Sequence, residues 1–403
     1  MKKTAAIICE FNPFHLGHKR LIDFARERGA ENIVCIMSGN FVQRGEPAVT
    51  DKYTRAKSAV LSGADLVLEL PMPFSAGSAE YFARAGVLIA DRLGIVDELV
   101  FGSETGDIET LCTEAEKTSS EAFLRVLEDK HVKEKGYAVA ASMAYRELFG
   151  DSAVASSPNN ILALEYIKAL RRIGSDILPV TVLREDNYLS AELAGEYPSA
   201  TALRKMTYDG ELDGLCSGMT KAAYETLIGA KKCGLFPTDL DRYGEAVMSV
   251  LRLGSPCGCE GGIGGLENRI REKSLACASY SEMLAELSTK KYSDARIRRT
   301  VLSSVLGIKP EDMKNDVSFV NLLAASEKGK ALLGRAKKKG TLAVITKPSE
   351  LKRYLASDEC ANKDAARRQA EISAMADALF TLCLPAPKDA GFFERTPPFL
   401  ADN

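Results

Sequence analysis

The sequence predicts an α/β protein: a Rossmann-like, doubly wound parallel sheet followed by a mainly α-helical C-terminal part. Through the first 210 residues, short apolar runs alternate with helical patterns, as in parallel sheets covered by helices on both faces. Beyond Gly210 the strand signals fade and helical spacing dominates. At 403 residues the chain is long enough for two cores, so we expect residues 1–210 and 211–403 to form two domains.

Each expected element corresponds to one stretch of the sequence. The expected strands are the apolar runs Ala5–Cys9, Ile33–Met37, Leu66–Leu70, Leu99–Phe101 and Ile177–Leu183. Helical patterns between them lie at Thr54–Ser62, Ala79–Leu93, Glu121–Asp129 and Asn160–Arg172. In the second part, helices are expected at Gly244–Leu253, Leu266–Ala276, Tyr280–Leu287 and Asp364–Leu384. The stretch GSPCGCEGGIGGLEN follows no strand, so we interpret it as a flexible linker and not as a phosphate loop.

The composition is that of an ordinary water-soluble protein, with 46% hydrophobic and 27% charged residues. No apolar run approaches the ~18–20 residues of a membrane span, and the opening MKKTAAIICEF lacks the pattern of a signal peptide. The ten cysteines include no C-x-x-C pair, which favours a reduced, cytoplasmic protein. Too few ligands surround the CGC at Cys257–Cys259 for zinc, so we predict no metal site built by the chain.

Two of the three histidines, His15 and His18, flank Gly17 between the first expected strand and the first helix. Ligands bind at this edge of open α/β sheets, and a helix N-terminus attracts phosphate. A histidine there can donate a hydrogen bond to a phosphate oxygen and stabilise charge that develops in a transition state. A pair of ordinary surface histidines is the alternative. The third histidine, His131, lies in the charged stretch DKHVKEK and is expected to be solvated.

Unusual residues gather where the five expected strands end. The stretches are EFNPFHLGH, MSGNFVQRGEPA, LELP, FGSETGD and VTVLRED. In a parallel sheet these ends meet at one crevice, where Gly102 would let a ligand approach the backbone and Arg184 would lie at the same edge. Ordinary turn chemistry explains any single end, but five together favour a ligand site.

Two helix starts supply further candidates. SSPNNILALEYIKAL puts Asn159 or Asn160 at a helix start, where a simple N-cap is a strong alternative. PSATALRKM places Ser199 and Thr201 at the opening of a short helix and Arg204 one turn on, which forms a plausible clamp for the β and γ phosphates of a nucleotide. A plain capped surface helix is the alternative there.

Basic residues cluster in the second half, although the net charge of −2 argues against a generally basic nucleic-acid binder. TKKYSDARIRRT carries five basic residues against one acidic residue, and 328–353 carries nine basic residues against Glu350. If the first stretch is helical, Lys291, Arg298 and Arg299 share a face that could neutralise phosphates. The predicted RNA contacts are Lys290, Lys291, Arg296, Arg298 and Arg299. A solvated helix face is the alternative.

Six stretches resemble the bacterial tRNA(Met) cytidine acetate ligases, a family of the HIGH-type nucleotidyltransferase superfamily. They are EFNPFHLGH, MSGNFVQRGEPA, FGSE, PNNILALEY, SATALR and KKYSDARIRR. The resemblance implies an enzyme that uses ATP and Mg²⁺ to activate acetate as acetyl-adenylate. It then implies transfer of the acetyl group to N4 of the wobble cytidine in elongator tRNA(Met). We therefore expect residues 1–210 to form the nucleotide-binding catalytic domain and residues 211–403 to form the helical, tRNA-binding domain. An adenylyl- or cytidylyltransferase acting on a small molecule, or a non-catalytic protein that binds nucleotide and RNA, is the alternative function.

The same resemblance implies the residues of the ATP site, with His15 and His18 as the catalytic pair. These residues are Ile7, Ile8, Cys9, Glu10, Phe11, Asn12, Pro13, Phe14, His15, Leu16, Gly17, His18, Lys19, Arg20, Gly102, Asn159, Arg184, Ser199, Thr201 and Arg204. SATALR lacks the adjacent serine–threonine pair of many adenylyltransferases, which leaves Thr201 a less fixed role than the histidines. No Ser-His-Asp or Cys-His arrangement is evident around the motif, as expected for phosphate chemistry without a protein nucleophile.

Overall fold

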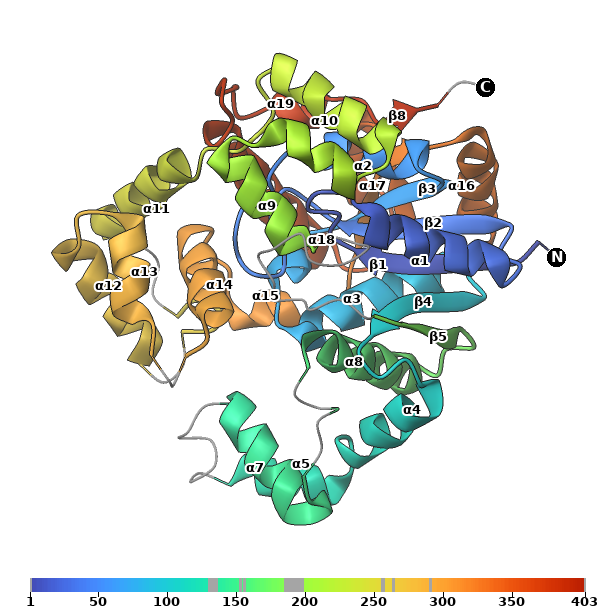
Figure 1. Ribbon diagram of the computed structural model, residues 1–403, viewed down its shortest axis with the longest axis horizontal. Helices are drawn as coiled ribbons and strands as arrows, with labels where there is room; N and C mark the ends of the chain where they lie inside the picture. The colour runs from blue at the N-terminus through green and yellow to red at the C-terminus, as the bar shows by residue number, and fades with distance from the viewer. Residues whose placement is uncertain are drawn as a thin grey trace.

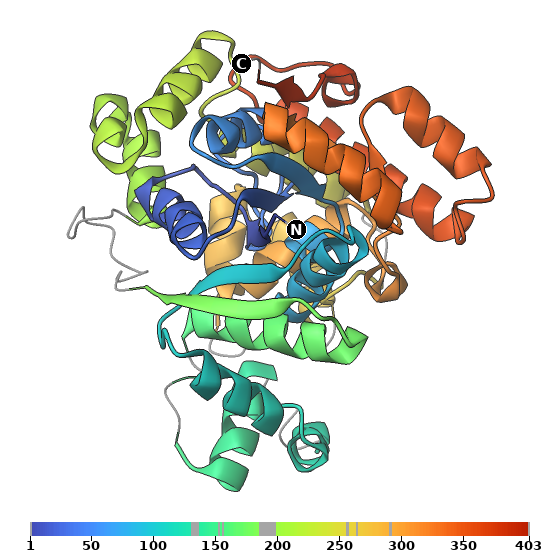
Figure 2. The ribbon, with the colours of Figure 1, turned by 90° about the vertical axis from the view of Figure 1, so that its right-hand side faces the viewer.

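The computed structural model describes residues 2–129, 137–151, 154, 157–184, 199–254, 258–262, 265–289 and 292–401. Within these residues an eight-stranded, mostly parallel sheet forms the centre of the protein, in the order β5-β4-β1-β2-β3-β6-β7, with β8 beside β6 (Figure 1 and Figure 2). The first five strands are β1 Thr4–Cys9, β2 Asn32–Ser38, β3 Leu66–Leu70, β4 Glu98–Ser103 and β5 Leu178–Leu183. All neighbours among these five pair in parallel, so their carboxyl ends meet at one edge. The five predicted strands are confirmed.

Helices cover both faces of the sheet because successive strand residues point to opposite sides. One face packs Val34 and Ile36 into a core with α3 (Ala79–Arg92), α8 (Pro158–Ile173) and α16 (Glu327–Lys339). The other face packs their neighbours, Ile33 and Cys35 among them, into a second core. That core is shared with α1 (Leu16–Glu27), α2 (Lys52–Leu61) and α10 (Lys221–Lys232). The predicted doubly wound α/β fold is confirmed.

The expectation that strands end near residue 210 is wrong. The second half of the chain contributes β6 Phe319–Ala325, β7 Ala343–Ile345 and β8 Phe399–Leu400. Strand β6 lies antiparallel to β3, with Leu66 opposite Ala325. The run FVNLLAA is short and apolar except for Asn321, and periodicity alone does not separate such a strand from a buried helical segment. The sheet therefore includes residues from both halves, while the assignment of catalysis and tRNA binding to separate halves stays a prediction.

The second half is otherwise helical, as predicted. Helices α11 (Leu240–Gly254), α12 (Leu266–Ala276), α13 (Tyr280–Leu287) and α14 (Asp294–Val305) cluster beside the sheet, on the left in Figure 1. Helices α5 (Glu121–Glu128) and α7 (Tyr137–Phe149) project from the bottom of the same view. The remaining helices are η1 Phe74–Ala76, α4 Ile108–Lys117, α9 Ala200–Asp209, η3 Leu212–Gly218, α15 Pro310–Lys314, α17 Pro348–Ala356, α18 Lys363–Leu382 and α19 Phe392–Arg395. Within the described ranges, none of the helices has the length and apolar character needed to span a bilayer.

Candidate nucleotide site at the carboxyl edge of the sheet

The turn from β1 to α1 places the histidine motif at the carboxyl edge, as predicted. Phe11 has φ +48°, a left-handed backbone conformation that costs energy for a residue with a side chain. Surrounding contacts hold the turn in place: Asn12 Oδ1 accepts a hydrogen bond from Val49 N at 2.8 Å, and the Phe11 and Phe14 rings are buried. The sequence therefore fixes the turn firmly enough to keep a strained residue beside the histidines.

His15 and His18 interlock through their Nδ1 atoms. His15 caps α1, with its Nδ1 accepting the Gly17 N–H at 3.0 Å, and His18 Nδ1 accepts the His15 N–H at 3.2 Å. Because each Nδ1 is an acceptor, each neutral ring carries its proton on Nε2. Burial, together with Arg184 and Arg204, lowers the pKa of His15 to about 3. Burial, His15 and Arg184 lower the pKa of His18 well below its ordinary value. The pair therefore presents uncharged N–H donors at neutral pH.

The ends of β4 and β5 and the start of α8 form a second wall. Arg184 Nη1 donates to Asn159 Oδ1 at 3.2 Å. Glu104 accepts hydrogen bonds from Asn159 N and Nδ2, at 3.1 and 2.8 Å, and from Asn160 N at 2.7 Å. A Cβ on Gly102 would lie 2.6 Å from Arg184 Cδ, so the glycine makes room for the arginine stem. Glu104 thus fixes Asn159, and Asn159 in turn holds Arg184 beside the histidines.

The alternative that an asparagine caps α8 is wrong. Ser157 occupies the N-cap position and Pro158 follows at the first helical residue. Asn160 is buried, and its Oδ1 accepts the Thr105 N–H at 3.2 Å, so it fixes the loop after β4. Asn159 is thereby left to meet Arg184. Glu104 is not among the predicted site residues, although FGSETGD shows an acidic residue between a strand end and a helix start.

Helix α9 closes the site from another side. Arg204 Nη1 donates to the Asn12 carbonyl and Nη2 donates to Thr201 Oγ1, both at 3.1 Å. Ser199 caps the helix, since its Oγ accepts the Ala202 N–H at 3.1 Å. The cap explains the position of Ser199, but α9 is more than a capped surface helix because Arg204 contacts the histidine turn directly.

The loop after β2 borders the turn on its other side. Glu10 Oε1 accepts the Gln43 N–H at 2.7 Å. The Arg55 side chain is buried and donates to four backbone carbonyls at the ends of β1 and β2 and in this loop. These carbonyls belong to Glu10, Ser38, Gly39 and Thr50. Burial lowers the pKa of Arg55 to about 10, which still leaves it cationic at neutral pH. Arg55 is not among the predicted site residues, because nothing in the helical pattern around it distinguishes it from an ordinary helix residue.

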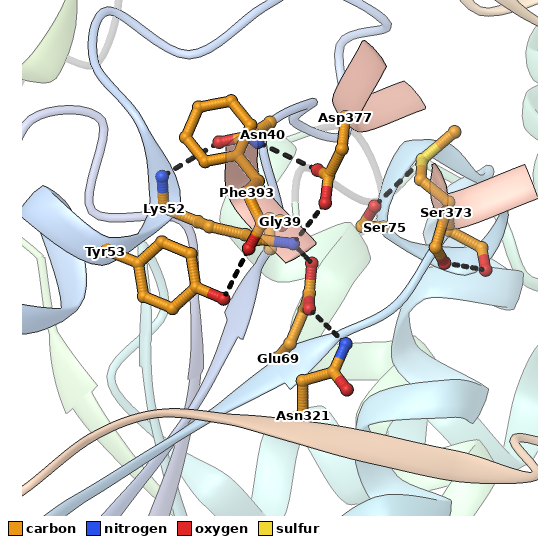
Figure 3. A network of polar contacts seen from close by, with 12 residues as sticks. Gly39, Asn40, Lys52, Tyr53, Glu69, Ser75, Asn321, Ser373, Asp377 and Phe393 are labelled. Atoms are coloured by element: carbon orange, nitrogen blue, oxygen red, sulfur yellow. Dashed lines mark hydrogen bonds and ion pairs between the residues drawn. The ribbon is translucent and has the colours of Figure 1, made fainter. Parts of the chain in front are cut away.

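The end of β3 does not join the predicted crevice. Glu69 lies instead in a buried ion network, with Lys52 Nζ 2.9 Å from Glu69 Oε1 and 2.7 Å from Asp377 Oδ2 (Figure 3). Asn321 Nδ2 donates to Glu69 Oε2 and Asn40 Nδ2 donates to Asp377 Oδ1, both at 2.8 Å. Asp377 and Glu69 outweigh the effect of burial and raise the pKa of Lys52. The network is a structural clamp that joins α2 and β3 to β6 and α18.

The predicted RNA-contacting arginines lie on α14, which packs against the loop after β2. Arg298 Nε lies 3.9 Å from Glu46 Oε2, and Arg299 Nη1 donates to the Gln43 carbonyl at 3.4 Å. A Cβ on Gly45 would lie 2.4 Å from Arg299 N, which shows how closely the loop approaches the helix. Both arginines are half-buried at this junction and are not a purely solvated face. The Arg296 guanidinium stacks on the Tyr292 ring, 5.2 Å from its centre.

Some predictions fall outside the described residues, namely those for Lys290, Lys291, Cys257 and His131. Within the described ranges, no group of three or more His, Cys, Asp or Glu side chains is arranged to hold a metal ion. Cys259 is buried.

Comparison with known proteins identifies the family. The HIGH Nucleotidyl Transferase family matches residues 1–391 of the chain. The chain is 33% identical to the tRNA(Met) cytidine acetate ligase of Acetivibrio thermocellus, over 96% of this chain and 97% of that protein. It is 34% identical to the enzyme of the same name from Thermoanaerobacter sp., over 89% and 92% of the two chains. Thermotoga maritima TmcAL bound with alpha-thio ATP superposes with a TM-score of 0.91 at 30% identity, over 99% of both chains. This chain therefore belongs to the tRNA(Met) cytidine acetate ligase family of the HIGH nucleotidyl transferases.

Proposed function

We propose that this protein is an ATP-dependent ligase that converts the wobble cytidine of elongator tRNA(Met) to N4-acetylcytidine. It activates acetate as acetyl-adenylate and then transfers the acetyl group to N4 of the cytidine. The observation that carries the proposal is the interlocked pair of neutral histidines beside Arg184 and Arg204, in a chain whose relatives bear this enzyme's name.

The charges of the site suit ATP. The triphosphate is a polyanion, and Arg184 and Arg204 supply cations at the edge where α1 and α9 begin. We assign ATP binding to the turn at residues 7–20 together with Gly102, Asn159, Arg184, Ser199, Thr201 and Arg204. Mg²⁺ is expected to arrive as MgATP, a substrate, held mainly by the phosphates.

The first step is an in-line displacement at the α-phosphate. An acetate oxygen forms the new P–O bond, the bond to the β-phosphate oxygen breaks, and pyrophosphate leaves with that electron pair. Negative charge grows on the α-phosphate oxygens, where His15 and His18 Nε2–H groups donate. These neutral N–H groups stabilise the developing charge by hydrogen bonding, with no proton transferred. Loss of one such donor typically costs ~10²–10³-fold in rate.

Isotope exchange between pyrophosphate and ATP tests this function. We expect exchange that depends on acetate, and incorporation of labelled acetate into a tRNA(Met) transcript but not into one with uridine at the wobble position. Exchange driven by a phosphorylated small molecule instead of acetate would support the small-molecule nucleotidyltransferase. Absence of all exchange would support a non-catalytic binding protein.

We further propose that Lys290, Lys291, Arg296, Arg298 and Arg299 bind the tRNA backbone and bring the wobble base to the nucleotide edge. The contact between α14 and the loop after β2 supports this placement, since Arg298 and Arg299 meet the loop whose Gln43 N–H binds Glu10, at the start of the histidine turn. Such binding requires the target base to be unstacked. Because tRNA is the proposed substrate, we place the protein in the cytoplasm.

The lysine pair offers the cleaner test, since Arg298 and Arg299 also hold the loop after β2. Lys290→Ala with Lys291→Ala should weaken tRNA binding and reduce its salt dependence by roughly 0.7–0.9 log units per lost phosphate contact. Acetate-dependent exchange should stay at the wild-type rate. Normal tRNA affinity and salt dependence in this variant would contradict the assignment.

A further inference from the structure

Glu10 is an acidic side chain at an edge that otherwise suits a polyanion. It follows β1 directly, and its Cα lies one position beyond the Cys9–Met37 pair of the β1–β2 register, beside Ser38. A carboxylate next to a triphosphate repels it, so contact with the phosphates of ATP does not explain an acid here. The residue therefore calls for a different role.

The contacts of Glu10 connect it to α14, the helix proposed to bind RNA. Its Oε1 accepts the Gln43 N–H at 2.7 Å, while the Gln43 carbonyl accepts from Arg299 Nη1 at 3.4 Å. Gln43 thus links Glu10, at the end of β1, to Arg299 on α14. Oε2 accepts no hydrogen bond from the residues that the structure describes, and it is not a fully buried atom. Glu10 consequently offers one fixed oxygen and one available oxygen between the histidine turn and the basic helix.

Charged and titratable groups surround Glu10 on several elements. They are Arg44 and Glu46 in the loop after β2, Arg204 on α9, Arg55 on α2, Tyr166 on α8 and Cys9 on β1. Burial raises the pKa of Glu10, and Glu46 adds to this, while the Gln43 N–H, Arg204 and Arg44 oppose it. A raised pKa makes a carboxylate a better proton acceptor near neutral pH.

We infer that Glu10 is the general base of the acetyl-transfer step, an assignment that rests on the proposed function. The amino nitrogen of cytidine is a weak nucleophile because its lone pair is delocalised into the ring, so attack needs proton removal. The nitrogen forms a bond to the acetyl carbonyl carbon, and the bond from that carbon to the AMP phosphate oxygen breaks. AMP leaves with the electron pair, and one amino proton passes to Glu10 Oε2 and then to water.

Glu10→Gln tests the assignment because the amide keeps an oxygen for the Gln43 N–H but cannot take the proton. Two rates are compared: acetate-dependent pyrophosphate exchange, and single-turnover transfer to tRNA from added acetyl-adenylate. We expect the ratio of transfer to exchange to fall by ~10²-fold or more, in the range typical of a lost general base. Glu31→Gln, an exposed carboxylate directly before β2 and at the amino end of the parallel strands, is the matched control and should leave both rates at the wild-type level.

The pH profile supplies a readout that a structural role would not change. Wild-type transfer should slow as the pH falls through a value above 4.5, the ordinary pKa of glutamate, because Glu10 becomes protonated. Glu10→Gln should show slow transfer without this inflection, and Glu10→Asp should recover part of the rate. If Glu10→Gln does not fold, the wild-type pH profile still tests the role of Glu10 as a base: a transfer rate that does not fall with the pH would contradict it.

Two results would overturn the assignment. An equal loss of exchange and transfer in Glu10→Gln would make Glu10 a nucleotide- or metal-positioning residue, and full transfer would remove it from the reaction. Failure of the proposed function is distinguishable, because the wild-type protein would then lack acetate-dependent exchange in the same assays.

Discussion

The ends of β1 and β3 lie on the same edge of one sheet but treat polar groups in opposite ways. At the end of β1, His15 and His18 are neutral and carry Nε2–H groups that donate to no partner among the described residues. At the end of β3, the Glu69 charge is buried and met by Lys52 and Asn321 within the protein. The edge therefore has two regions. At the end of β1, uncharged donors remain for a charged ligand. At the end of β3, buried charges pair with one another and join the two halves of the chain.

The largest effect is expected from breaking the clamp. Lys52→Met removes the cation shared by Glu69 and Asp377 and leaves two carboxylates buried without it. Loss of one member of a buried ion pair costs about 3–5 kcal/mol, which we expect in the free energy of unfolding measured by urea titration. Lys231→Met, at an exposed position near the end of α10, should change it by less than about 0.5 kcal/mol.

A second variant sharpens this experiment. Adding Glu69→Gln to Lys52→Met removes one of the two buried carboxylate charges left without a cation. This should restore part of the lost free energy of unfolding. If Lys52→Met alone is as stable as the wild type, the network in Figure 3 does not clamp the sheet.

At the other strand end, His18→Ala should lower acetate-dependent pyrophosphate exchange by ~10²-fold or more, about 2.7 kcal/mol, while the melting temperature changes little. His18→Gln should retain more activity because its amide N–H can take the place of Nε2–H. Exchange close to the wild-type rate in His18→Ala would remove the histidine from catalysis.

The neutral state of the histidines also predicts a pH profile. A histidine whose pKa is lowered to about 3, as for His15, stays uncharged from neutral pH down to about pH 4. Exchange should therefore show no inflection near 6.5, the ordinary histidine value. An inflection at that pH that disappears in His18→Gln would contradict this protonation state.

The smallest effect is expected at Gly102. An added methyl group would lie 2.6 Å from Arg184 Cδ, and the flexible arginine stem would yield before the backbone does. Gly102→Ala should therefore preserve stability but raise the KM for ATP by roughly tenfold, about 1.4 kcal/mol. Gly229→Ala, where a Cβ meets no atom within 4 Å, is the control. An unchanged KM would show that Arg184 does not contact ATP.

Sequence patterns predicted the part of this edge that is local in the chain. The strand Thr4–Cys9, the histidine turn and the start of α1 follow one another directly, so their spacing determined where the histidines lie. Arg184 and Arg204 were also predictable, because each follows a strand end or helix start of recognisable pattern. The place of Arg184 beside the histidines required only that the sheet be parallel, whereas that of Arg204 also depends on how α9 packs against the turn.

The clamp could not be predicted in this way. Lys52 and Asp377 are 325 positions apart, and nothing local to either residue marks the other as its partner. Arg55 gives as little indication, since its role depends on carbonyls presented by the ends of two strands and the loop after β2. The pairing of β6 with β3 was missed for the same reason: it is a contact between distant segments, and the sequence around Phe319–Ala325 carries no feature that specifies its neighbour.

The position of β6 has a consequence for how the protein is made. Strand β3 emerges from the ribosome roughly 250 residues before β6, which at about 5–20 residues per second leaves it without this neighbour for some ten to fifty seconds. During that time its unpaired edge is open to other chains. Lys52 precedes Glu69 in the chain and is already available to it, whereas the hydrogen bond from Asn321 and the ion pair of Lys52 with Asp377 need the later segments. Completion of the buried network therefore goes together with the covering of the β3 edge.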